Sequence, residues 1–148
     1  MTTKYYIAGP MGGLPKFNYP AFDEAATAVR ALGLEALSPA EMDDPETRKL
    51  ALASETGDLN TFDGPETWGD FLSRDVKIVA DICDGVVLLP GWENSRGARL
   101  ECFIALTVQK PVFLYKFGAL VETNAGRLAE TIASYVINQG DVSRYVGE

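Results

Sequence analysis

The feature that most constrains the fold is the alternation of short apolar runs with segments of helical periodicity. Four apolar or β-rich runs lie at 4–8, 34–37, 86–89 and 111–115. Four segments with helical spacing or helix-favouring ends lie at about 20–33, 65–83, 96–109 and 124–137. The pattern predicts an α/β fold, a three-layer, doubly wound, flavodoxin-like parallel sheet of four to five strands.

The length of 148 residues suits one domain, and we expect residues 1–148 to form it. The polar, turn-rich stretch at about 41–66 departs from the alternation and is predicted to be an irregular insertion with one short helix near 45–54. In a doubly wound sheet, ligands bind beyond the carboxyl ends of the strands. The loops at 9–19, 39–68 and 90–95 are therefore the candidate binding loops.

The charge balance disfavours several kinds of partner. The chain has 21 acidic and 13 basic residues and a net charge of −8, which repels nucleic acid polymers and anionic membranes. No run approaches the ~18 apolar residues of a membrane span, and the N-terminus does not resemble a secretory signal, so we expect a cytoplasmic protein. Cys83 and Cys102 lie in apolar runs without CxxC spacing, which predicts buried free thiols.

The chain contains no histidine. Histidine-based triads and zinc sites are therefore excluded, and acid–base chemistry would rely on carboxylates, tyrosines or lysines. We expect neither a metal nor another cofactor.

Asp75 interrupts the apolar stripe of its predicted helix. The stripe consists of Trp68, Phe71, Leu72, Val76, Val79 and Ile82. At 100° per residue, Asp75 lies about 40° from Phe71 and about 20° from Ile82. Two explanations remain open: local backbone groups satisfy the carboxylate at the edge of the sheet, or Asp75 is an acid at a pocket wall with a shifted pKa.

Glu101 borders the inner face expected for its helix, which is formed by Leu100, Phe103, Ile104 and Thr107. Its side chain leans towards Gly97 in the first turn, where a glycine costs about 1 kcal/mol relative to alanine and leaves open space. Ser95 is a candidate N-cap, and a helix N-terminus favours an anionic ligand. Two carboxylates with Tyr6, at the end of the first strand, suit the cleavage of an N-glycosidic bond through an oxocarbenium-like transition state.

Three motifs resemble the nucleoside 2-deoxyribosyltransferase superfamily, including its small uncharacterised bacterial and phage relatives. They cover roughly residues 4–115 in the order found in that family. The motifs are Tyr6-Ile7-Ala8-Gly9-Pro10, Arg74-Asp75 followed by Val79 and Asp84, and the segment 95–101 (SRGARLE) followed by Ala105 and Lys110-Pro111-Val112.

The resemblance implies catalytic roles for three residues. Glu101 would be the nucleophile, Tyr6 would orient it, and Asp75 would contact or protonate the base. Ser95 is similar to the serine with which nucleotide N-hydrolases of the superfamily contact a 5′-phosphate, whereas the transferases commonly have an aspartate there that binds the free 5′-hydroxyl.

The first loop resembles the phosphate loop of these hydrolases. Substrate-binding candidates are Gly9, Met11, Gly12, Gly13, Ser95, Gly97 and Trp68. Gly12 stands where one hydrolase has a basic residue, and Arg96 or Arg99 is a candidate for that missing charge. Trp68, Phe62 and Phe17 are aromatics that could stack on a base or serve as core anchors.

The leading hypothesis is an N-glycosidase that cleaves the base–sugar bond of a (2′-deoxy)nucleoside 5′-monophosphate. The alternatives are a nucleoside 2-deoxyribosyltransferase and a non-catalytic nucleotide-binding or sensing module. The expected partner is a small nucleoside or nucleotide. Because family members commonly complete the site across a subunit interface, we expect a homodimer or a larger homo-oligomer. The base, and the choice of ribose or deoxyribose, stay open.

Overall fold

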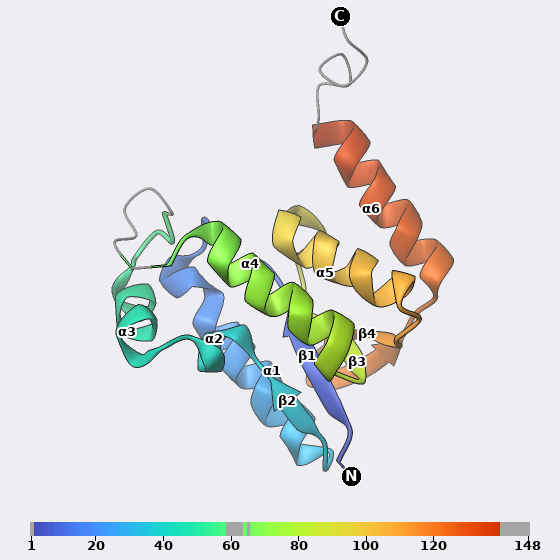
Figure 1. The fold of residues 1–148 in the computed structure, drawn as a ribbon, viewed down its shortest axis with the longest axis horizontal. Coiled ribbons are helices and arrows are strands. Elements are labelled where there is room, and N and C mark those ends of the chain that lie inside the picture. The colour runs from blue at the N-terminus through green and yellow to red at the C-terminus, as the bar shows by residue number, and fades with distance from the viewer. Residues whose placement is uncertain (1, 59–63, 65, 140–148) are drawn as a thin grey trace, which may run out of the picture.

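The computed structural model describes residues 2–58, 64 and 66–139, and contains a five-stranded sheet of order β2-β1-β3-β4-β5 (Figure 1). The parallel strands are β1 (Lys4–Ala8), β2 (Glu35–Leu37), β3 (Gly85–Leu88) and β4 (Val112–Lys116). β5 (Ala119–Glu122) pairs antiparallel with β4. The predicted α/β, flavodoxin-like architecture is confirmed.

The strand β5 was not predicted from the sequence. Its pairing of Ala119 with Lys116 leaves a two-residue hairpin turn, Phe117-Gly118, in which both residues have positive φ values. Two-residue turns of this kind match the twist of antiparallel strands. A phenylalanine in the first turn position is not a typical turn signal, so this hairpin was missed.

Within the described residues, six α-helices connect or follow the strands. They are α1 (Tyr19–Ala31), α2 (Pro39–Met42), α3 (Pro45–Ala53), α4 (Trp68–Lys77), α5 (Arg96–Thr107) and α6 (Ala125–Gln139). Shorter helical turns occur at η1 (Pro15–Asn18), η3 (Ile78–Ile82) and η4 (Trp92–Asn94). The predicted short helix near 45–54 is α3, and α2 is an additional turn of helix before it. None of the helices among the described residues is long and apolar enough to cross a membrane.

The two faces of the sheet bury alternate residues of its central strands. Tyr6, Val86 and Leu88 pack with residues of η3, α5 and α6. Ile7 and Val87 pack on the opposite face with residues of α1, α2 and α3. The sheet is therefore the middle of three layers, with α4 and α5 side by side on one face (Figure 1). The predicted buried free thiols, Cys83 and Cys102, are confirmed.

Two details of the predicted helix faces were wrong. The helix that begins at Trp68 changes to a wider π-helical turn at Ile78, which alters the angle per residue, and Ile82 is exposed rather than part of the buried stripe. Trp68, the first residue of the helix, is exposed as well. In α5, Leu100, Phe103 and Thr107 of the predicted inner face are exposed. The inner face instead consists of the small residues Ala98, Cys102 and Ala105, which allow the helix to pack closely on the sheet.

Candidate functional site

A cavity lies at the carboxyl ends of β1 and β3, where the following loops lead to opposite faces of the sheet. It has a volume of about 150 Å³ and is called the inner cavity below. Nine of the predicted site residues line it: Tyr6, Gly9, Met11, Gly12, Trp68, Asp75, Ser95, Gly97 and Glu101. Such a switch point is the expected ligand site of a doubly wound sheet.

Gly13 is the predicted site residue that the structure does not bring to the inner cavity. Its backbone N–H donates a hydrogen bond to the carbonyl of Gly57 at 2.8 Å, so this donor already has a partner. Gly57 has a φ of 67°, and a Cβ there would lie 2.0 Å from the Leu14 carbonyl oxygen. The loop 9–19 is therefore held by a backbone hydrogen bond to the segment that follows α3.

An outer cavity of about 490 Å³ adjoins the inner one. The two share five lining residues: Met11, Gly12, Trp68, Ser95 and Gly97. The outer cavity also contacts Arg96, at the N-terminus of α5. Ser95 Oγ caps this helix by accepting a hydrogen bond from the Ala98 N–H at 3.1 Å. The two cavities therefore form one continuous binding region of a smaller and a larger part.

Tyr6 and Glu101 are in direct contact on the wall of the inner cavity. The Tyr6 hydroxyl donates a hydrogen bond to Glu101 Oε2 at 2.5 Å, although the residues are 95 positions apart in the chain. Glu101 is only 6% exposed. Its burial raises the pKa of the carboxyl from 4.5 to about 8, against the opposing effect of the Tyr6 hydrogen bond. Burial also raises the pKa of Tyr6, so the phenol keeps its proton and remains a donor.

Asp75 is the one buried residue of α4, although it is acidic. Its Oδ1 accepts a hydrogen bond from Arg74 Nε at 2.7 Å. Burial raises the pKa of Asp75, while the hydrogen bond and charge of Arg74 lower it. The structure therefore satisfies Asp75 with a neighbouring side chain and leaves it lining the inner cavity, as in the second of the two explanations above.

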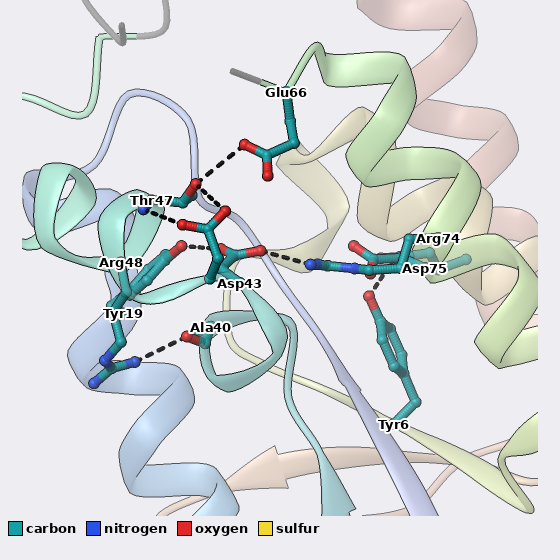
Figure 2. Close-up of polar contacts among 11 residues, drawn as sticks. Tyr6, Tyr19, Ala40, Asp43, Thr47, Arg48, Glu66, Arg74 and Asp75 are labelled. Atoms are coloured by element: carbon teal, nitrogen blue, oxygen red, sulfur yellow. Dashed lines mark hydrogen bonds and ion pairs between the residues drawn. The ribbon is translucent and has the colours of Figure 1, made fainter. Parts of the chain in front are cut away.

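The segment 39–53 forms the opposite wall of the inner cavity through Pro39, Asp43, Thr47 and Ala51. The Asp43 carboxylate accepts hydrogen bonds from Arg74 Nη1 at 2.7 Å and from the Tyr19 hydroxyl. Figure 2 shows this connection from Tyr19 through Asp43 to Arg74 and Asp75, with Tyr6 pointing towards the same group. Part of the predicted insertion is therefore built into the site.

The sequence matches the family described as Domain of unknown function (DUF4406) over residues 3–114. The chain belongs to this family. The match extends from β1 into β4 and includes every residue named above as lining the inner cavity. No curated protein sequence gives a significant match. The family description states no activity, so the function of this DUF4406 protein has to be argued from its site.

Apolar and aromatic side chains form much of the DUF4406 site. Phe17 is buried against the inner cavity in a left-handed backbone conformation with a φ of 50°. Trp68 is half exposed, and the guanidinium of Arg96 lies 5.4 Å from the centre of its ring. Phe62, the third predicted stacking residue, lies outside the described residues. A flat heterocycle suits such a cavity.

The two candidate cations for a phosphate differ in position. Arg99 is buried and donates a hydrogen bond to the carbonyl of Glu93 at 2.7 Å, and it lines neither cavity. Arg96 lines the outer cavity beside Ser95. Within the part of the chain that the structure describes, no cluster of three or more acidic or cysteine side chains could hold a metal ion.

Proposed function

We propose that this protein is an N-glycosidase that cleaves the base from a (2′-deoxy)nucleoside 5′-monophosphate. The observation that carries the proposal is the contact of Tyr6 with Glu101 on the wall of a cavity that Asp75 also lines. A non-catalytic nucleotide-binding module gains nothing from buried carboxylates beside an anionic ligand. Their burial is costly unless a reaction uses them.

In the first step of the proposed reaction, a Glu101 carboxylate oxygen forms a bond to C1′ of the sugar. The C1′–N bond breaks, and its electron pair leaves with the base, which takes the proton of Asp75. Tyr6 holds the attacking carboxylate through its hydrogen bond at 2.5 Å. A retaining cleavage of a glycosidic bond requires two groups of the enzyme at the same bond, a nucleophile and an acid.

In the second step, water attacks C1′ and breaks the bond to Glu101. Asp75, now a carboxylate, accepts the proton of that water and is ready for the next cycle. The products are the free base and the sugar 5-phosphate. If a second base replaces water as the acceptor, the same intermediate leads to the deoxyribosyltransferase reaction.

The 5′-phosphate is proposed to bind at the junction of the two cavities. Ser95 Oγ accepts the N–H that it caps, so its hydroxyl hydrogen is available to a phosphate oxygen. Arg96 lines the adjoining outer cavity and is proposed to supply the positive charge that Gly12 lacks. The helix N-terminus adds a favourable potential for an anion.

The proposed enzyme is cytoplasmic, uses no metal or other cofactor, and forms a homodimer or larger homo-oligomer. Subunit number can be measured by light scattering during size-exclusion chromatography. A mass equal to one chain of 16.0 kDa at micromolar concentration would reject the oligomer.

The proposal is tested with a panel of nucleosides and 5′-monophosphates, by measuring release of free base. Each substrate is incubated with and without a second base, and Glu101→Gln protein provides the background rate. Base release from monophosphates without an acceptor supports the hydrolase. Release that requires an acceptor identifies a transferase, and nucleotide binding without release identifies a binding module.

A further inference from the structure

Arg74 joins two carboxylates that come from different walls of the inner cavity. Its Nε donates to Asp75 Oδ1 and its Nη1 donates to Asp43 Oδ1, each at 2.7 Å. The Asp43 side chain is 5% exposed, and its second oxygen accepts the Tyr19 hydroxyl. The Asp43 side chain therefore lies buried with partners on both oxygens, in the two-residue break between α2 and α3 (Figure 2).

We propose that Asp43 is a positioning residue of this site, which holds the guanidinium of Arg74 and thereby keeps Asp75 able to carry a proton. The inference deepens the proposed function and rests on it for the role of Asp75 as the acid. The predicted effect of Asp43 on the protonation of Asp75 is a property of the protein without substrate, so it can be tested even if no substrate is known.

The charges around Asp75 give the direction of the effect. The titratable and charged groups that face it are Tyr6 of β1, Arg74 of α4, Glu101 of α5 and Asp43. Burial raises the pKa of Asp75, the hydrogen bond and charge of Arg74 lower it, and the charge of Asp43 raises it again. By itself, the positive charge of Arg74 would favour the ionised form of Asp75. Asp43 shares that arginine and partly cancels its charge.

This arrangement matters for an acid that must donate a proton. In the proposed reaction, Glu101 has to be a carboxylate while Asp75 is protonated. Glu101 is the more buried group, and its pKa of about 8 means that it competes for the proton. A feature that makes Asp75 easier to protonate therefore increases the share of protein in the productive state.

A purely structural role for Asp43 predicts a different result from the proposed one. Asparagine has the same size as aspartate but carries no charge. Its amide oxygen can accept the hydrogen bond from Arg74 Nη1, and its amide NH2 can donate to the Tyr19 hydroxyl oxygen in place of the bond that Asp43 Oδ2 accepts. If Asp43 only ties two parts of the chain together, Asp43→Asn should change stability and leave the titration of Asp75 as it is.

The experiment is an NMR titration of the Asp75 carboxyl carbon in wild-type, Asp43→Asn and Asp44→Asn proteins. Asp44 is the matched control, because it is adjacent in the chain and caps α3 through the Thr47 N–H. Asparagine is an equally good N-cap, so this variant removes a neighbouring charge without a change in fold. We expect the midpoint of Asp75 to fall in Asp43→Asn and to stay constant in Asp44→Asn.

The activity measurement provides the second readout. Turnover by Asp43→Asn at pH 8 should fall roughly 3–10-fold, and the alkaline limb of the kcat profile should move to lower pH. Superimposable Asp75 titrations in Asp43→Asn and wild type overturn the inference, and Asp43→Ser serves the same test if the asparagine variant does not fold. A shifted titration in a protein that cleaves no substrate leaves the inference in place and rejects the proposed function.

Discussion

The two walls of the inner cavity are built in different ways. One wall comes from β1, α4 and α5, and these regular elements place Tyr6, Asp75 and Glu101 through their own backbone hydrogen bonds and core packing. The other wall is the segment 39–53, which contains two short helices. Because these helices are short and are separated by a break at Asp43 and Asp44, the position of the segment depends on its side-chain contacts with other elements.

Besides the Arg74–Asp43 pair, two further arginine pairs attach the segment 39–53 to α1. Arg30 of α1 donates to Glu41 at 2.5 Å, and Arg48 of α3 donates to Asp23 of α1 at 2.6 Å. Substitutions in the first wall should therefore remove chemistry and spare the fold. Substitutions in the second wall should change stability or adjust the acid, with smaller effects on turnover.

The largest effect is expected for Glu101→Gln. The amide has the same shape but cannot attack C1′, so base release should fall by at least about 10³-fold while the protein stays folded. Circular dichroism and a turnover assay on the same sample measure both properties. Activity within about tenfold of wild type would contradict the assignment of Glu101 as the nucleophile.

The next effect is expected for Asp75→Asn, which should lower turnover by roughly 10²–10⁴-fold because no proton reaches the departing base. The melting temperature should stay constant or rise, since a buried acid is replaced by a neutral group. Asp81→Asn is the control, because Asp81 lies six residues beyond Asp75 and forms an exposed pair with Lys77. A lower melting temperature with full activity would make Asp75 a structural residue.

The difference between the two walls also explains what the sequence could reveal. Glu101 and Asp75 were found because an acidic residue stands out against helical periodicity. Tyr6 was found because it lies in a recognisable first strand, in a motif that resembles a known family. Asp43 could not be found in this way. It stands beside Asp44 and Pro45, a combination that is typical of a helix N-cap, and nothing in its neighbours indicates Arg74, which lies 31 residues further along the chain. A contact between the break that separates two short helices and a distant helix has no periodicity from which to infer it.

A third expected effect is on stability at different pH values. Burial raises the pKa of Glu101 from 4.5 to about 8, so the folded protein binds more protons than the unfolded chain between these values. The free energy of unfolding should therefore fall as the pH rises through this window. Glu101→Gln should reduce that fall by about 2–4 kcal/mol. Urea unfolding of both proteins at pH 5 and pH 8 measures this difference in the free energy of unfolding. An equal fall in wild type and Glu101→Gln would contradict the raised pKa of Glu101.

A smaller effect is expected for Ser95→Asp. Aspartate retains the N-cap of α5 but places a negative charge against the proposed phosphate, so kcat/KM for the monophosphate should fall roughly 10–150-fold relative to the matching nucleoside. Ser95→Asn retains the cap without the charge and should have a much smaller effect. Equal rates on nucleoside and monophosphate, unchanged in Ser95→Asp, would reject the phosphate site and favour the transferase.

The smallest effect is expected for Arg48→Met, which tests the attachment of the second wall. Arg48 pairs with Asp23, donates to the Ala40 carbonyl at 2.9 Å and lies over the ring of Tyr19. Because the pair is partly exposed, its loss should cost about 1 kcal/mol, which lowers Tm by about 2–4 °C in a domain of this size. Lys77→Met removes a more exposed pair and should change Tm by less. Turnover by Arg48→Met should stay within a few-fold of wild type, since Asp43 keeps its direct bond to Arg74. A loss as large as that of Glu101→Gln would mean that the docking of the segment 39–53 is as necessary as the nucleophile, and the two walls would then have equal importance for the reaction.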